Sequence, residues 1–247
     1  MKSTSKVSLV NKKISEQFPH DYIDDRIRKA VKIIGNKEVN RYLDIGCSNG
    51  LVTKYIAEKV NAKEAYGVDV ANVKEARKRG VNAFEIDLNE DKETPFASGY
   101  FDLITCLDTL EHVYNTDFVV DEIYRLLKKG GVAVITVPRT DSLVNIVLLA
   151  LGFQMMSGST SLEKNYGAFS ENRISGHMAH FTKKALIEMF KYHNFKIEAY
   201  TEASAVEAWF GDLGVKGTKI TPVKKMLGIV ISKIPFKKEI CVLKVRK

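Results

Sequence analysis

The sequence has few cysteines and no long apolar run, and both absences narrow the class of protein. Its 247 residues include three cysteines, none of them in a C-x-x-C pair. This argues against a structural zinc site and indicates a reducing compartment. No apolar run reaches the roughly 18 residues that a membrane-spanning helix needs, and residues 1–13 are too polar for a signal peptide. We therefore expect a cytoplasmic protein, with peripheral contact to a membrane left open.

Two phosphate-binding fingerprints are also missing. The chain contains neither the G-x-G-x-x-G of dinucleotide-binding folds nor the G-x-x-x-x-G-K-[ST] of the P-loop. It has instead a short apolar run from Tyr42 to Ile45, which includes Asp44 and is followed by a turn between Gly46 and Gly50. A helical pattern begins directly after the turn. Glycines here let the backbone pass close to a ligand, and the first helical turn points free N–H groups at it.

Apolar runs of strand length alternate with helical patterns along most of the chain. The further expected strands are Glu64–Val70, Asn82–Leu88, Phe101–Cys106, Val132–Pro138, Phe195–Tyr200 and Glu239–Val245. Alternation at this spacing predicts a doubly wound, mostly parallel α/β sheet with helices on both faces. We also expect a helix that is capped by Asp21 and closed by Gly35, a helix that ends at residues 128–131, and a helix capped by Thr182.

The pattern D-x-G-x-x-x-G from Asp44 to Gly50 resembles the first motif of the class I S-adenosylmethionine-dependent methyltransferases. Leu110-Glu111-His112, together with the Lys-Gly-Gly turn at 129–131, is similar to the subset that includes ubiquinone-biosynthesis O-methyltransferases. The resemblance is close from Tyr42 to Pro138 and looser beyond. It implies a Rossmann-like seven-stranded sheet whose last strand is antiparallel. It also implies a single domain over residues 1–247, with substrate-side inserts at about 139–180 and 204–238.

The resemblance implies S-adenosylmethionine as cofactor and assigns residues to its three parts. The glycine turn would hold the methionyl end, the acid at the end of the second strand the ribose diol, and the end of the third strand the adenine. The expected cofactor residues are Asp44, Gly46, Cys47, Gly50, Asp69, Val70, Asp87, Leu88 and Leu107. A carboxylate at the end of a second strand can accept two hydrogen bonds from a ribose diol. The alternative for Asp69 is a surface acid that caps the next helix.

The expected reaction is methylation of a hydroxyl group, with methylation of a carbon atom as the alternative. Amine-directed relatives often show Asn/Asp-Pro-Pro-Tyr after the fourth strand, whereas this chain has Leu107-Asp108-Thr109-Leu110. A hydroxyl nucleophile has to lose a proton, and histidine is suited to accept it near neutral pH. We take His112 and His180 as candidate catalytic residues and keep His177 as a further candidate. Each of them has a structural role as the alternative.

The segment after the fourth expected strand also permits a metal site. Asp108-x-x-Glu111-His112 with a later histidine resembles the divalent-metal set of small-RNA 2′-O-methyltransferases and some quinone O-methyltransferases. Those relatives typically have Glu at the first position, where this chain has Asp108. The alternative is that Glu111 and His112 support the following helix.

The acceptor is expected to be a small or lipid-like molecule. Residues 142–156 are almost wholly apolar, which is consistent with a buried helix, a lid over an apolar substrate, or a membrane contact. Residues 224–238 interleave apolar and basic side chains, so a packed helix and an interfacial helix both fit.

The net charge of +8 permits an RNA substrate. The basic residues are dispersed along the chain and no RNA-binding module is recognisable, which argues against an RNA substrate. A non-catalytic cofactor-binding protein is the remaining alternative.

Overall fold

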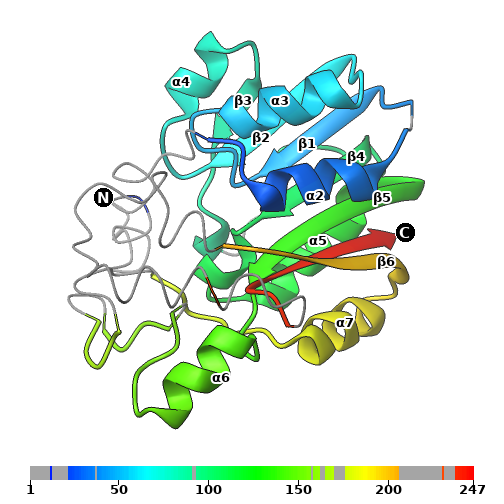
Figure 1. The fold of residues 1–247 in the computed structure, drawn as a ribbon. Helices are drawn as coiled ribbons and strands as arrows, with labels where there is room; N and C mark the ends of the chain where they lie inside the picture. Colours follow the sequence, from blue (N-terminus) through cyan, green and yellow to red (C-terminus); the bar gives the residue numbers. More distant parts are fainter. Residues whose placement is uncertain are drawn as a thin grey trace.

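Seven strands form one sheet in the computed structural model, in the order β3-β2-β1-β4-β5-β7-β6 (Figure 1). The structure describes residues 12, 22–36, 38–90, 93–156, 158–161, 165–169, 176–205, 230 and 237–247. The strands are β1 (Arg41–Ile45), β2 (Glu64–Asp69), β3 (Asn82–Glu85), β4 (Phe101–Leu107), β5 (Leu127–Pro138), β6 (Lys196–Ala203) and β7 (Ile240–Arg246). The pairs from β3 to β5 are parallel, and β7 runs antiparallel to both β5 and β6. The predicted fold class is therefore confirmed.

Helices cover both faces of the sheet. They are α2 (Asp25–Ile34), α3 (Leu51–Lys59), α4 (Val73–Lys78), α5 (Thr116–Leu126), α6 (Leu143–Ala150) and α7 (Lys183–Tyr192), with 3₁₀ turns η1 (Leu88–Glu90) and η2 (Leu110–His112). Apolar side chains of α2 and α3 pack with Tyr42 of β1 on one face. Those of α5 and α7 pack with Leu43 on the other face. Neighbouring strand residues point to opposite faces, so two separate apolar cores hold the sheet in place.

The carboxyl ends of β1, β2 and β4 lie at one edge of the sheet because these strands are parallel. The chain turns sharply directly after each of them. Ser48, Asn72 and Asp108 adopt positive φ angles of 44°, 58° and 47° there. Residues other than glycine rarely adopt this conformation, and they do so chiefly in turns and at functional sites. These tight turns therefore lie at the edge of the sheet where the sequence predicts the ligand site.

Three predicted element boundaries were wrong. The N-cap of α2 is Asp24, whose carboxylate accepts a hydrogen bond from the N–H of Ile27, and not Asp21. Residues 128–131 lie in β5 and do not end a helix, because the N–H of Gly130 and the C=O of Gly131 pair with Lys247 beside β7. The third strand ends at Glu85, so that residues 87 and 88 lie in a turn.

Other expectations for the helices agree with the structure. Gly35 closes α2, and the hydroxyl of Thr182 accepts the N–H of Ala185 at the start of α7. The side chain of Ser142 caps α6 in the same way. No helix among the described residues is long and apolar enough to cross a membrane. The stretch 224–238, for which a packed helix and an interfacial helix both fit the sequence, lies outside the described residues except for 230, 237 and 238.

Candidate active site

The turn after β1 is held by the two strands that flank it. The N–H groups of Gly46 and Cys47 both donate to the carbonyl of Val68 in β2, at 2.8 and 3.1 Å. A Cβ atom at Gly46 would lie 1.9 Å from the hydroxyl oxygen of Thr109, which follows β4. Gly46 also has a φ of +84°, so both conformation and space require glycine. Gly50, with a φ of +79°, ends the turn and begins α3.

Asp69 joins the ends of β1 and β2. One oxygen of its carboxylate accepts the N–H of Ser48 at 2.8 Å, and the other accepts the N–H of Ala71 at 2.9 Å. The first bond fixes the glycine turn and the second fixes the chain that leads to α4. Val70, beside it, is half-buried. The carboxylate is thus oriented at the predicted cofactor edge, and its role toward a ribose stays a prediction.

Asp44 is almost completely buried, at 2% exposure, beside the turn. Its two oxygens accept hydrogen bonds from the hydroxyls of Thr53 and Thr105, both at 2.6 Å. Burial raises the pKa of Asp44 to about 6, although these hydrogen bonds oppose the shift. A cationic group placed against Asp44 would stabilise its charged form. Thr105 was not predicted as part of the site, because only the register between β1 and β4 places it opposite Asp44.

A small cavity lies between α2 and the glycine turn. Its lining includes Arg26, Asp44, Gly46, Cys47 and Leu107. Four of these five are predicted cofactor residues, and the structure brings them together around one space. Arg26 is the residue that the sequence did not reveal as functional. The only signal in the sequence was a charged residue next to Ile27 on the apolar face of the predicted helix.

Arg26 carries a buried positive charge in this cavity. It is 4% exposed, and its guanidinium pairs with the carboxylates of Asp108 and, at 3.2 Å, Asp24. Burial lowers the pKa of Arg26, but the charges of Asp108 and Asp24 outweigh this and raise it above its usual value. Its buried Nε has no hydrogen-bond partner among the described residues. A buried donor without a partner costs about 1–3 kcal/mol, so a bound acceptor would be favoured there.

The residues predicted for the adenine lie in the turn after β3. An oxygen of the Asp87 carboxylate accepts the N–H of Asn89 at 2.9 Å, and Leu88 is buried. Asp87 also lines a wider, open pocket with Arg77, Phe84 and other residues beside β3. The structure therefore separates these two residues from the small cavity at the methionyl side. Their contact with an adenine remains a prediction.

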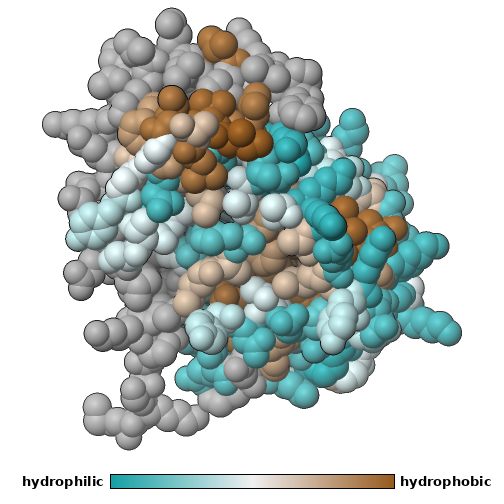
Figure 2. Space-filling view, turned by 90° about the horizontal axis from the view of Figure 1, so that it is seen from below, coloured by the Kyte–Doolittle hydropathy of each residue, from teal (hydrophilic) through white to brown (hydrophobic). Residues whose placement is uncertain are grey.

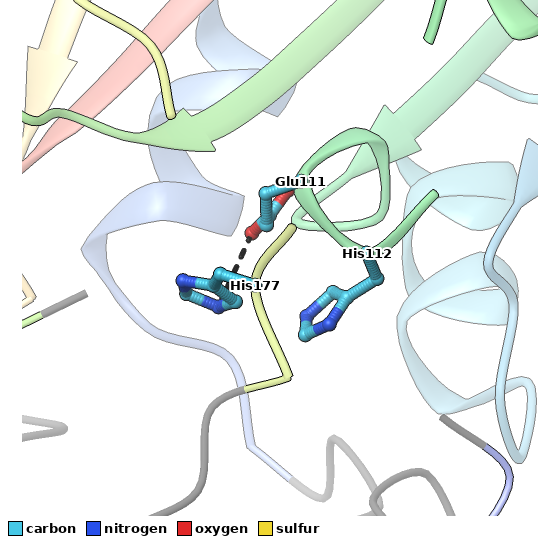
Figure 3. Close-up of side chains that lie close together, drawn as sticks. All are labelled: Glu111, His112 and His177. Atoms are coloured by element: carbon cyan, nitrogen blue, oxygen red, sulfur yellow. Dashed lines mark ion pairs between the residues drawn. The ribbon is translucent and has the colours of Figure 1, made fainter. Parts of the chain in front are cut away.

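Glu111, His112 and His177 lie together after the end of β4 (Figure 3). One potential ligand atom from each lies within 4.8 Å of the others. The Nε2 of His177 is 3.9 Å from a carboxylate oxygen of Glu111, and the two imidazole rings are 4.7 Å apart. The N–H groups of Met178 and Ala179 donate to the backbone carbonyl of Glu111, which holds the two segments side by side. His180 is exposed and is not part of this cluster.

The cluster contains a buried acid that lacks a hydrogen-bond partner among the described residues. Glu111 is 1% exposed, and neither of its carboxylate oxygens accepts a hydrogen bond from a described residue. Burial and the charge of Asp108 raise its pKa well above the usual value, while Arg26 lowers it. Burial also lowers the pKa of His112, so its imidazole is neutral at pH 7. In its ionised form Glu111 would offer a carboxylate oxygen beside the ring nitrogens of the two histidines, and such a donor set suits a divalent transition metal.

The comparisons with known proteins identify the family of this chain. A family described as "Methyltransferase domain" matches residues 16–200. The chain belongs to this family. Its predicted cofactor, S-adenosylmethionine, is thereby confirmed at the level of the family, and so is the resemblance seen in the sequence.

Two curated relatives of this methyltransferase-family chain are named as O-methyltransferases. The ubiquinone biosynthesis O-methyltransferase of Psychrobacter cryohalolentis is 27% identical over 132 residues, which are 50% of this chain and 49% of that protein. The protein of the same name from Marinobacter nauticus is 30% identical over 119 residues, covering 45% and 46%. The chain thus spans about half the length of the curated relatives it matches.

Solved structures share the fold at low identity. A putative methyltransferase in complex with the Trm112 activator of Haloferax volcanii has a TM-score of 0.66 and 12% identity, with 99% of each chain covered. The N-methyltransferase NodS of Bradyrhizobium japonicum, solved with S-adenosyl-L-homocysteine, has a TM-score of 0.57 and 13% identity, with 96% and 98% covered. These structures extend the likeness beyond the region that the curated relatives match.

Proposed function

We propose that this protein transfers the methyl group of S-adenosylmethionine to a hydroxyl oxygen of a small or lipid-like molecule. The supporting observation is the place of the Glu111–His112–His177 cluster. It follows β4, and the glycine turn follows β1, which is the strand next to β4 in the sheet. A group able to handle an acceptor's proton therefore lies at the same edge as the predicted cofactor site. The names of the curated relatives are consistent with O-methylation.

The reaction needs alignment and the removal of one proton. The hydroxyl oxygen attacks the methyl carbon as the carbon–sulfur bond breaks, and S-adenosylhomocysteine leaves with the bonding electrons on its sulfur. The glycine turn, Asp44 and Asp69 would hold the donor, and the protein's task is to align it with the acceptor. His112, kept neutral by burial, can accept the acceptor's proton. Alternatively, a divalent cation held by Glu111, His112 and His177 would make the acceptor hydroxyl more acidic.

Calorimetric titration with S-adenosylhomocysteine tests the cofactor site. Asp69→Asn keeps the shape of the side chain but removes its charge and one acceptor. We expect it to weaken binding by about ten-fold or more, since a hydrogen bond to a charged group contributes about 1.5–3 kcal/mol. Glu58→Gln, at an exposed position of α3, is the matched control and should bind as the wild type does. Equal affinity for Asp69→Asn and wild type would contradict the site assignment.

The acceptor is tested with a panel of phenols, catechols and amines. Mass spectrometry should detect addition of one methyl group to a hydroxyl-bearing compound and none to the amines. Methylation of amines alone would contradict the proposed acceptor atom and leave the cofactor assignment intact.

The surface around α6 supports a lipid-like acceptor in particular. Figure 2 shows an apolar patch on the face seen from below, and α6 lies at the bottom of Figure 1. Ile146, Leu149, Leu151 and Phe153 are exposed by 42%, 52%, 63% and 37%. Of the three alternatives that the sequence left open for residues 142–156, a fully buried helix therefore does not fit this side of α6. The helix begins five residues after Pro138, which ends β5 at the site edge, so an acceptor drawn from a lipid surface would lie close to the cofactor.

A further inference from the structure

Four buried side chains form a continuous series of hydrogen bonds behind the small cavity. The phenol oxygen of Tyr42 lies 2.6 Å from the hydroxyl of Thr105, which donates to one oxygen of Asp44 at 2.6 Å. The hydroxyl of Thr53 donates to the other oxygen of Asp44, also at 2.6 Å. Tyr42, Thr53 and Thr105 are fully buried, whereas Asp44 lines the cavity. The series therefore ends where the methionyl part of the cofactor is expected.

The strands β1 and β4 and the helix α3 bring these four side chains together. Tyr42 and Asp44 are two residues apart in β1, so they point to the same face of the sheet. Thr105 lies directly opposite Asp44 in the register of β1 and β4. Thr53 is in the first turn of α3, which packs on this face. The hydroxyls are thus placed by regular elements of the fold and not by a loop.

The direction of each hydrogen bond follows from the number of protons that are present. The hydroxyl of Thr105 has one proton, and an ionised carboxylate only accepts, so this proton is used on Asp44. Tyr42 then has to donate to Thr105. Burial and the charge of Asp44 raise the pKa of Tyr42 well above its usual value, so the phenol keeps its proton. All three hydroxyls therefore direct their protons toward Asp44.

These donors counteract the effect of burial on Asp44. Burial raises the pKa of Asp44 to about 6 and the charge of Asp69 adds to the shift, whereas the hydrogen bonds from Thr105 and Thr53 lower it. An ionised carboxylate offers about four acceptor positions, and the two threonines use one on each oxygen. The carboxylate is thus mostly ionised at pH 7 and keeps acceptor positions for a ligand in the cavity.

The other titratable groups around Asp44 leave it as the anionic group that lines the cavity. Arg26 of α2 lines the same cavity with a positive charge, and Asp69 lies at the end of the neighbouring β2. The thiols of Cys47 and Cys106 are neutral, because burial raises their pKa well above the usual value. The cavity therefore presents one cationic and one anionic side chain, which suits the zwitterionic end of an amino acid.

We propose that Thr105 and Thr53, supported by Tyr42, are positioning residues that keep Asp44 ionised and oriented, so that the site selects a cofactor with a free ammonium group. Their hydroxyls act through Asp44. A buried carboxylate that stays charged attracts an ammonium more strongly than an exposed one does, since the local dielectric constant is lower. The inference rests on the proposed function, because it takes S-adenosylmethionine as the ligand, and it names the residues that set selectivity for its amino group.

Calorimetric titration of the full chain with two ligands tests this inference. One ligand is S-adenosylhomocysteine, and the other is its analogue that lacks only the α-amino group. Because the ammonium binds the ionised form of Asp44, the affinity for S-adenosylhomocysteine is present above the pKa of about 6 and is lost as pH falls through it. We expect a loss of about ten-fold from pH 7 to pH 5, and no such loss for the analogue.

The variant Thr105→Val keeps the shape of the side chain and removes the hydroxyl. Asp44 then keeps its proton to a higher pH, so binding of S-adenosylhomocysteine should weaken about ten-fold at pH 6 and less than about two-fold at pH 8. Binding of the amino-free analogue should stay within about two-fold of wild type at both pH values. Thr105→Ser restores the hydroxyl and should recover the wild-type pH profile.

Three further variants locate the effect. Thr53→Val removes the donor to the other oxygen of Asp44 and should show the same dependence on ligand and pH. Tyr42→Phe should change the profile in the same direction but by less, because Tyr42 donates to Thr105 and not to the carboxylate. Thr201→Val, at a half-buried position of β6, is the matched control and should bind both ligands as the wild type does.

The outcomes separate selectivity from a merely structural role. Equal weakening of both ligands by Thr105→Val and Thr53→Val would overturn the inference, since a distorted fold affects both alike. So would equal affinity of the wild type for the two ligands, or a flat pH profile for S-adenosylhomocysteine. If thermal denaturation shows that Thr105→Val does not fold, Thr53→Val and the wild-type profile decide. These results leave the proposed function standing, whereas failure of the wild type to bind S-adenosylhomocysteine would remove both.

Discussion

At the scale of single residues, Gly46 gives the most direct test of the turn. Gly46→Ala places a methyl group against the hydroxyl of Thr109 at a φ of +84°. We expect it to lower the free energy of unfolding by about 2–4 kcal/mol, through backbone strain and overpacking together. It should also abolish calorimetric binding of S-adenosylhomocysteine, because the turn has to move to accommodate the methyl group.

Gly80→Ala is the matched control for this substitution. Gly80 has a φ of +86°, but a Cβ atom there would meet nothing within 4 Å. Urea denaturation should show a loss of only about 1–2 kcal/mol from the backbone conformation, with cofactor binding retained. Adding Thr109→Ala to Gly46→Ala removes the nearest clashing atom and should recover part of the stability. Equal losses for Gly46→Ala and Gly80→Ala would show that the contact with Thr109 is unimportant.

The residues of the site that could be predicted are those with a local signal in the sequence. Asp44, Gly46 and Gly50 stand at a fixed spacing within one strand and turn, and Glu111 and His112 adjoin the end of a strand. Arg26 and Thr105 could not be found in this way. Arg26 meets Asp108 across 82 positions, and Thr105 meets Asp44 across 61. Such contacts depend on the order of the strands and on the packing of α2, which no local pattern contains.

At the scale of elements, a buried histidine ties α7 to α5. The ring nitrogens of His193, at the end of α7, lie 2.6 Å from Asp121 and 2.8 Å from Asp117 of α5. Burial lowers the pKa of His193, but the hydrogen bonds and charges of the two carboxylates outweigh it and raise the pKa above its usual value. Both nitrogens face acceptors, so the ring is held as the doubly protonated imidazolium.

The contact of His193 with Asp117 and Asp121 should make the free energy of unfolding depend on pH. Because the folded-state pKa is raised, the stabilisation is fully present below the unfolded pKa of about 6.5 and is lost as pH rises through the folded-state value. Asp121→Asn should therefore cost about 1 kcal/mol at pH 6 and progressively less toward pH 9. Urea denaturation across this range measures the difference. Glu188→Gln, whose ion pair with Lys184 stays within α7, is the control and should show no such trend.

Two helix ends were predicted correctly because their cause is local. Thr182 and Gly35 mark helix ends through their own side chain or φ angle. The helix end predicted at residues 128–131 was wrong because lysines followed by glycines are typical of a helix C-terminus. In the structure, Gly130 and Gly131 instead form backbone hydrogen bonds with Lys247, more than 100 residues further along the chain, and so extend β5. Competition between a local end signal and a distant strand partner is decided only by the tertiary structure.

At the scale of the whole molecule, the order of strands and helices was predictable because the chain alternates them regularly. The parallel core from β3 to β5 and the antiparallel β7 are both observed. The exposure of one side of α6 could not be predicted, since residues 142–156 are apolar almost throughout. A wholly apolar helix carries no periodic signal for which side is covered. Its surface role has to be measured on the intact protein.

Flotation with vesicles of phosphatidylcholine and phosphatidylglycerol measures that role. We expect the full chain to float at low salt, because the apolar surface of α6 can enter the interface and the net charge of +8 attracts anionic headgroups. The double variant Ile146→Gln, Leu149→Gln should bind at least about ten-fold more weakly, since two half-exposed side chains lose their burial in lipid. Tyr192→Gln alters a more exposed residue, on α7, and should bind like the wild type. Absence of flotation at low salt, or equal flotation of the double variant, would contradict a membrane-facing α6 and favour an acceptor taken from solution.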